Sequence, residues 1–107
     1  EARLRAARAF FYGALDEAWG AALAGGEVTL AHSRDMRLAV SHAVAESTAV
    51  VDAMYALAGG TSVYAASPLQ RQFRDVHVAT QHFMVSPNIL ETVGRLFLGL
   101  PTNTAGF

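Results

Sequence analysis

The sequence predicts an all-α fold, an up-and-down helical bundle within a single domain over residues 1–107. Apolar side chains recur at steps of three and four residues over long stretches, which gathers them on one face of a helix. Glycine pairs and Ser-Pro steps separate these stretches, as is typical of helix ends and helix starts. No stretch alternates apolar and polar residues in the way that a half-buried strand requires.

The first helix is expected over residues 2–23 and ends before the pair Gly25-Gly26, because glycine readily adopts the left-handed conformation found at helix ends. Its apolar stripe comprises Leu4, Ala7, Phe11, Leu15, Ala18 and Ala22. Three aromatic residues lie off that stripe, namely Phe10, Tyr12 and Trp19. We therefore expect a second face of this helix to be covered as well.

The second helix is expected over residues 30–58, with Thr29 as its N-cap. Its core stripe comprises Val40, Val44, Ser47, Val51, Met54 and Ala58. Much of its remaining surface is alanine, and small side chains let neighbouring helices approach closely. This helix is therefore predicted to be central. Glu46 follows His42 by one turn and is placed to pair with it when the imidazole is protonated.

Two shorter helices follow, and each starts at a Ser-Pro step. We expect the third from Ser67 to about His82, with Ser67 and Gln70 as a capping box around a proline at the first helical position. Leu69, Phe73, Val76 and Thr80 share one of its faces. The fourth is expected from Ser86-Pro87 to about Gly99, followed by a tail over residues 101–107. Its buried face is expected to use Ile89 or Leu90, Val93, and Leu96 or Phe97.

The composition excludes several classes of protein. The net charge is −1, so no basic surface points to nucleic acid. The chain has no cysteine, which removes disulfides and thiolate sites, and its histidines lack metal-ligand spacing, so we expect no metal. No stretch resembles a membrane span or a signal peptide, and a cytoplasmic location is expected. Charged residues are only 16% against a usual share of about a quarter, which predicts faces hidden against other domains or subunits.

One order of motifs resembles a known family, the C-terminal helical domain of the acyl-CoA dehydrogenase-like flavoproteins. These motifs are the glycine pair Gly59-Gly60, the helix start Ser67-Pro68, the charged cluster Arg71, Arg74 and Asp75, the step Gln81-His82, and the segment from Gly94 to Gly99. Within that family the chain most resembles the two-component flavin-dependent monooxygenases, of the kind that act on 4-hydroxyphenylacetate, hydroxysteroids or dibenzothiophene.

The resemblance implies a bundle of the acyl-CoA dehydrogenase C-terminal type, as a C-terminal fragment of a larger flavoenzyme, with its first bundle helix before Glu1. It implies a homo-oligomer, a tetramer in that family, that uses reduced FMN or FAD supplied by a separate reductase. An aromatic or polycyclic small molecule would be hydroxylated through a flavin C4a-hydroperoxide. The isolated domain would be inactive.

The resemblance also implies roles for particular residues. Gly59, Gly60 and Thr61 would bind the cofactor, at a junction that in the family contacts the flavin of a neighbouring subunit. A glutamine of the dehydrogenase pattern is replaced here by Ala56, which favours transient uptake of reduced flavin.

His82 would be catalytic, facing the flavin ring and the substrate. Phe83 and Met84 would line the substrate pocket, at the point where dehydrogenases carry their catalytic glutamate.

Each of these residues also has a structural interpretation. Gly59-Gly60 is equally a helix C-cap, and a histidine in the position of His82 is usually a helix cap. Arg71 and Asp75 are spaced for a one-turn ion pair, and the charged cluster is expected to orient its helix. Phosphate binding by Arg71 or Arg74 remains open. His77 is expected to be a surface histidine that faces away from His82.

Two other functions remain open at this stage. The chain can belong to an acyl-CoA dehydrogenase that binds FAD and carries its base elsewhere. It can also be a non-catalytic helical module that only drives oligomerisation.

Overall fold

The computed structural model describes all residues from Glu1 to Phe107, and it confirms the all-α prediction. The α-helices are α1 (Ala2–Leu23), α2 (Leu30–Ala58), α3 (Pro68–Ala79) and α4 (Pro87–Phe97). Two short 3-10 helices, η1 (Gly59–Val63) and η2 (Phe83–Val85), precede α3 and α4. The first two helices have the predicted bounds.

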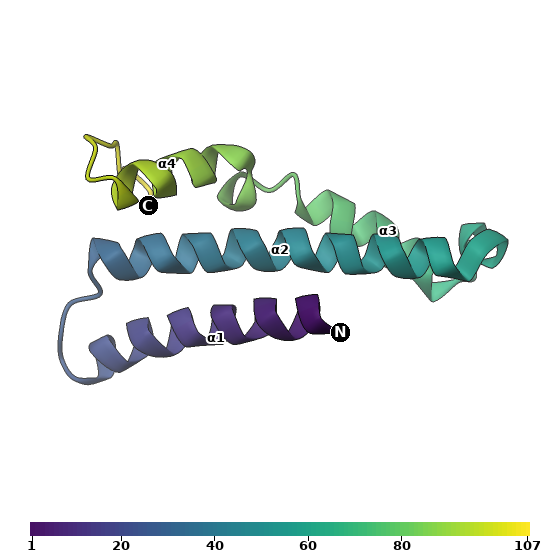
Figure 1. Ribbon diagram of the computed structural model, residues 1–107, viewed down its shortest axis with the longest axis horizontal. Helices are drawn as coiled ribbons and strands as arrows, with labels where there is room; N and C mark the ends of the chain where they lie inside the picture. The colour runs from purple at the N-terminus through teal and green to yellow at the C-terminus, as the bar shows by residue number, and fades with distance from the viewer.

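The central element is α2, as predicted from its small side chains. Helix α1 runs antiparallel along one side of it, and α3 and α4 return in succession along the other (Figure 1). Helix α2 is about 43 Å long at a rise of about 1.5 Å per residue. Almost every contact between elements therefore involves α2.

Helix α2 begins at a reciprocal cap. The Thr29 hydroxyl accepts a hydrogen bond from the His32 backbone N–H at 3.4 Å, and the Thr29 N–H donates to His32 Nδ1 at 3.1 Å. The imidazole thus takes the place that glutamate or glutamine usually holds in a capping box. The predicted N-cap is confirmed, and His32 is structural.

The capping box predicted at Ser67 and Gln70 is wrong. The Ser67 side chain makes no capping bond, and the only bond between these residues joins the Gln70 backbone N–H to the Ser67 carbonyl at 3.2 Å. The start of α3 is instead favoured by Pro68, because the fixed φ of proline suits the first helical position.

Helix α3 is shorter than predicted, because it ends at Ala79 rather than near His82. The Thr80 hydroxyl donates to the His77 carbonyl at 2.6 Å, so it takes up an acceptor at the helix end. Two tight turns follow, with Gln81 N–H bonded to the Val78 carbonyl and His82 N–H bonded to that of Ala79. His82 therefore lies beyond the end of α3 rather than on the helix.

Helix α4 is fixed to α2 by the Arg34 guanidinium, which lies over a ring of α4. Arg34 donates to both carboxylate oxygens of Asp35, at 2.8 and 3.1 Å, and its guanidinium lies 3.9 Å from the centroid of the Phe97 ring. The hydrogen bond with Asp35 raises the pKa of Arg34, so the guanidinium stays charged. The buried face of α4 is Ile89, Val93 and Leu96, while Leu90 and Phe97 are exposed.

The predicted pair of His42 and Glu46 is not formed. Glu46 lies 3.6 Å from the Arg3 guanidinium of α1, and His42 packs against the Phe10 ring at 6.0 Å between centroids. Both side chains therefore join α1 to α2 rather than bonding to each other along one helix.

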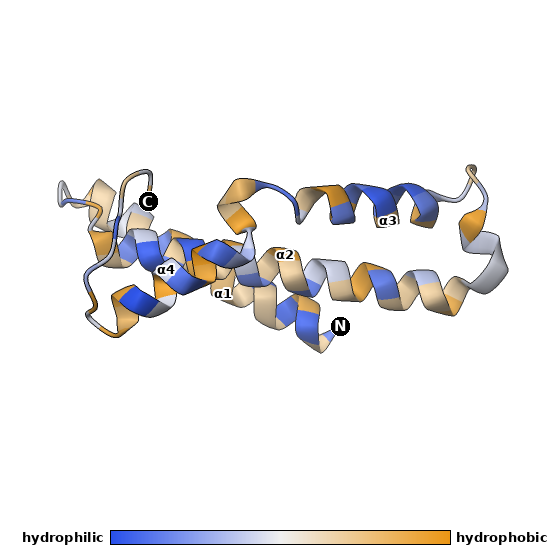
Figure 2. Ribbon diagram, turned by 90° about the horizontal axis from the view of Figure 1, so that it is seen from above, coloured by the Kyte–Doolittle hydropathy of each residue, from blue (hydrophilic) through white to orange (hydrophobic).

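The chain alone leaves much apolar surface open. Its radius of gyration is 16.7 Å, against about 13 Å for a compact domain of this length. Its accessible surface is 7212 Å², against about 5,800 Å² for a compact monomer of this mass. Apolar colour extends around α1 and α2, whereas α3 shows a polar stretch (Figure 2). The off-stripe aromatics Phe10, Tyr12 and Trp19 are exposed here.

The predicted core stripe of α2 faces an open groove rather than a closed interior. Val40, Val44 and Ser47 line a hollow of about 350 Å³ together with Phe11 of α1 and Val76 of α3, and nearly all of its surface is apolar. The fully buried residues of α2 are instead Ala39 and Ser41.

Helix α2 ends at Gly59, whose φ of 60° and ψ of −145° lie in a region that only glycine adopts readily. Gly60 has no positive φ. Behind this turn the Ser62 hydroxyl donates to the Gly59 carbonyl at 2.7 Å, and Ser62 is buried. The turn is thus closed by both backbone conformation and a buried hydrogen bond.

Replacing Gly59 by alanine should lower the free energy of unfolding by about 1–3 kcal/mol, because the new Cβ strains the backbone. Gly60→Ala is the matched control, since open space surrounds both positions and only the φ differs. Chemical denaturation of the two variants measures the difference, and equal stabilities would contradict the conformation assigned to Gly59.

Replacing Thr29 by alanine should cost about 0.5–2 kcal/mol, because α2 loses its N-cap. Ser67→Ala removes a hydroxyl from the same position of α3, where no capping bond exists, and should change stability by less than about 0.5 kcal/mol. A thermal or denaturant melt that ranks these two variants in the opposite order would refute the assignment of the caps.

Candidate functional site

His82 lies between α3 and η2, and its backbone is extended, with φ −68° and ψ 132°. Its side chain is exposed, and Nδ1 accepts a hydrogen bond from the Met84 backbone N–H at 3.2 Å. Because Nδ1 is an acceptor, the neutral imidazole carries its proton on Nε2. The ring therefore presents an N–H donor away from the turn.

Phe83 and Met84 differ in their surroundings. The Phe83 ring stacks on His82 with 4.9 Å between centroids, and it is 71% exposed. Met84 is half-buried against α2, where its sulfur lies 2.7 Å from a guanidinium nitrogen of Arg37. The turn thus has an aromatic outer side and a thioether facing α2.

Gly59, Gly60 and Thr61 lie together at the other end of α2. All three are exposed, and an added Cβ at either glycine would meet open space. The Thr61 hydroxyl donates to the Ala58 carbonyl at 2.8 Å, so it closes the helix end. The backbone of this junction is accessible to a flat or extended ligand.

The structure does not bring the predicted cofactor-binding and catalytic residues together. Met84 contacts α2 at Arg37, whereas the glycine junction follows Ala58. The stretch of α2 between them is about 30 Å long at about 1.5 Å per residue. His82 and Gly59 of one chain therefore cannot contact the same flavin ring.

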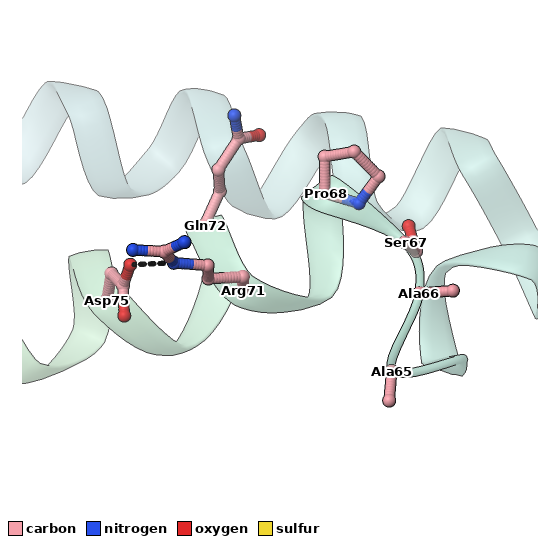
Figure 3. A pocket seen from close by; sticks show the side chains of 7 residues that line it. All are labelled: Ala65, Ala66, Ser67, Pro68, Arg71, Gln72 and Asp75. Carbon is pink, nitrogen blue, oxygen red and sulfur yellow. Dashed lines mark ion pairs between the residues drawn. The ribbon is translucent and has the colours of Figure 1, made fainter.

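A polar hollow of about 500 Å³ lies beside the start of α3 (Figure 3). Its lining includes Ser67, Arg71 and Gln72. Arg71 forms the predicted ion pair with Asp75, at 3.4 Å, and both side chains are largely exposed. A solvated pair of this kind contributes only about 0.2–1 kcal/mol to stability.

His77 is partly exposed at the surface, as predicted, but its side chain also has partners on two helices. Its Nε2 lies 2.8 Å from Asp52 Oδ1 of α2, and its ring packs on Phe73 at 4.4 Å between centroids. Tyr55 of α2 also packs on Phe73, at 4.5 Å between ring centroids. Asp52 is the only charged residue between Ser47 and Ala58. A lone charge in such an apolar stretch usually has a partner, so the sequence did contain a sign that Asp52 pairs with another side chain.

The two ends of α2 present different chemical groups. The junction at Gly59–Thr61 presents accessible backbone, and the turn at His82–Phe83 presents an Nε2–H and an aromatic ring. No group of three or more histidine, aspartate or glutamate side chains lies together as a metal site. None of the helices combines the length and hydropathy that a membrane span needs.

Two curated proteins are similar to the chain over most of its length. Both are named indole-3-acetate monooxygenase. The protein from Acinetobacter baumannii is 36% identical over 100 residues, which is 94% of this chain and 26% of the relative. The protein from Pseudomonas putida is 37% identical over 99 residues, which is 92% of this chain and 25% of the relative.

The chain spans about a quarter of the length of these relatives. A family model described as the acyl-CoA dehydrogenase C-terminal domain matches residues 1–87, from the start of α1 to the start of α4. This range contains both the glycine junction and the His82 turn. The chain therefore belongs to the family of the acyl-CoA dehydrogenase C-terminal domain.

Proposed function

We propose that the chain is the C-terminal helical part of a flavin-dependent monooxygenase that hydroxylates a small aromatic compound. The two relatives are named for an oxygenase reaction on indole-3-acetate, which supports this function over a dehydrogenase or a non-catalytic module. Indole-3-acetate is accordingly the first substrate to assay. The activity is that of the whole protein.

The observation that carries the proposal is the His82 turn. An exposed imidazole presents its Nε2–H beside the Phe83 ring, and residues 82–85 include no carboxylate. Abstraction of an α-proton from an acyl thioester needs a base such as a carboxylate, which this turn lacks. A hydrogen-bond donor can hold an oxygen atom in place, and the aromatic ring beside it can pack against an aromatic substrate.

The cofactor is reduced FMN or FAD, delivered by a separate flavin reductase. When bound, the flavin activates oxygen for transfer to the aromatic ring. The residues of this chain hold the cofactor and keep the reacting groups apart from water. His82 donates from Nε2 toward the flavin or the substrate, and Phe83 and Met84 form part of the substrate wall.

The glycine junction serves a second flavin, held mainly by a neighbouring copy of the protein. The separation of about 30 Å along α2 supports this arrangement, since one flavin ring cannot reach both ends. It makes the protein a homo-oligomer, with a tetramer as the expected state. Each α2 would then link two active sites.

The apolar groove between α1, α2 and α3 is covered by a further helix of the bundle. Its long apolar lining, from Phe11 on α1 to Val76 on α3, matches the face of an amphipathic helix. The chain also exposes about 1,400 Å² more surface than a compact monomer of this mass. Such an area exceeds the roughly 800 Å² that each partner contributes to a standard protein interface.

Replacing His82 by alanine in the full-length protein should reduce the amount of hydroxylated product formed per reduced flavin oxidised. Loss of a positioned hydrogen-bonding or proton-transfer group typically costs about 10²–10⁴-fold in rate. The flavin should still be oxidised, with hydrogen peroxide released in place of product. The measurement is product by liquid chromatography and peroxide by a coupled assay.

The matched control is Gln81→Ala, which changes the adjacent exposed residue and removes only its bond to Thr80. This variant should keep the product yield of the unchanged protein. An unaltered yield in His82→Ala would rule out the proposed role of His82.

A further inference from the structure

A small hollow lies between α2 and the His82 turn. It is lined by Met36, Arg37 and Val40 of α2 and by Met84 of η2, and it measures about 180 Å³. Its exposed lining is almost wholly apolar. An apolar cavity of about 150 Å³ can admit a benzene ring, so this hollow has room for one aromatic ring.

The only charged group that lines this hollow is Arg37, and no carboxylate of the chain neutralises it. One guanidinium nitrogen donates to the Met84 sulfur at 2.7 Å, and another donates to the Gly106 carbonyl at 2.9 Å. The Phe107 ring lies 5.7 Å from the guanidinium carbon. A thioether is a weak acceptor, so the contact with Met84 is one that a stronger acceptor can replace.

Other arginines that line hollows differ from Arg37 in this respect. Arg34 is bonded to Asp35, Arg71 to Asp75, and Arg3 lies against Glu46. Arg37 alone among these combines an apolar hollow with an unneutralised charge. A half-buried guanidinium in this state gains most from an added carboxylate, which it can bind through two parallel hydrogen bonds.

The hollow lies directly next to the His82 turn. Met84 forms the wall between them, because its backbone N–H is bonded to the His82 ring while its side chain reaches Arg37. An aromatic ring on this wall would thus have a cation on one side and the turn that carries the imidazole on the other.

We propose that Arg37 is a specificity-determining residue that binds the carboxylate of an aromatic acid substrate, whose ring packs against Met36, Val40 and Met84. The inference rests on the proposed monooxygenase function and adds to it the residue that recognises the acid group of the substrate. The carboxylate displaces the Met84 sulfur from the guanidinium, and the bond to the tail carbonyl is retained.

The test compares an acid with its neutral amide in the full-length protein, using indole-3-acetate and indole-3-acetamide. Arg37→Ala should raise KM for the acid by about tenfold to a hundredfold, as for the loss of a hydrogen bond between charged groups. KM for the amide should change by less than about twofold. Arg37→Lys should restore part of the affinity for the acid, because it restores the charge without the planar fork.

Two further variants guard against a purely structural effect. Arg37→Gln keeps donors for Met84 and Gly106 but has no charge, and it should lose the preference for the acid as Arg37→Ala does. Arg95→Ala removes a guanidinium that also donates to a tail carbonyl, that of Pro101, and it should leave KM for both compounds unchanged.

Calorimetric binding of both compounds to the flavin-free protein separates this inference from the proposed function. Weaker binding of the acid alone in Arg37→Gln supports the inference even if no hydroxylation is found. Equal losses for acid and amide would mean that Arg37 only holds the tail and the turn, and would overturn the inference. Unchanged binding of the acid in both Arg37 variants would overturn it as well.

Discussion

Packing on α2 is the constraint on which the rest of the structure depends. Helices α1, α3 and α4 and both 3-10 helices contact α2, and of these elements only η1 and α3 also make substantial contact with each other. Small residues make this close packing possible, and Ala39, in the N-terminal third of the helix, is fully buried. Charged and aromatic contacts then fix each neighbour in place, through the Arg3–Glu46 pair for α1, the Asp52–His77 pair for α3 and the Arg34–Phe97 contact for α4. A change in the direction of α2 would therefore move the glycine junction and the His82 turn together.

The length of α2 also determines how the chain can contribute to catalysis. Because about 30 Å separates the glycine junction from Arg37, the two ends of the helix would serve different cofactor positions in the proposed enzyme. In the proposed homo-oligomer, the bundle is both the interface between copies and the wall of each site. Such a double role would account for an apolar surface that a monomer of this size would not leave uncovered.

Helix positions could be predicted because their signals are local. Apolar periodicity, the glycine pairs and the Thr29 cap gave α1 and α2 their bounds, and prolines marked the starts of α3 and α4. The end of α3 could not be predicted, because it depends on whether the Thr80 hydroxyl bonds to a helix carbonyl or to solvent. The partners of His77 and Glu46 were missed for a different reason. Each lies on another helix, and spacing along one helix carries no information about such a contact. Nothing in the sequence marked out Arg37, because its proposed role depends on the absence of a neighbouring carboxylate in the folded chain.

The most direct measurement of the central claim uses isotopically labelled oxygen with the full-length protein. Reduced FMN or FAD would be supplied by a reductase, indole-3-acetate would be added, and the product would be analysed by mass spectrometry. The account predicts a hydroxylated product that carries one oxygen atom from molecular oxygen. A product without label, or oxidation of the flavin with only hydrogen peroxide formed from the unaltered protein, would contradict it.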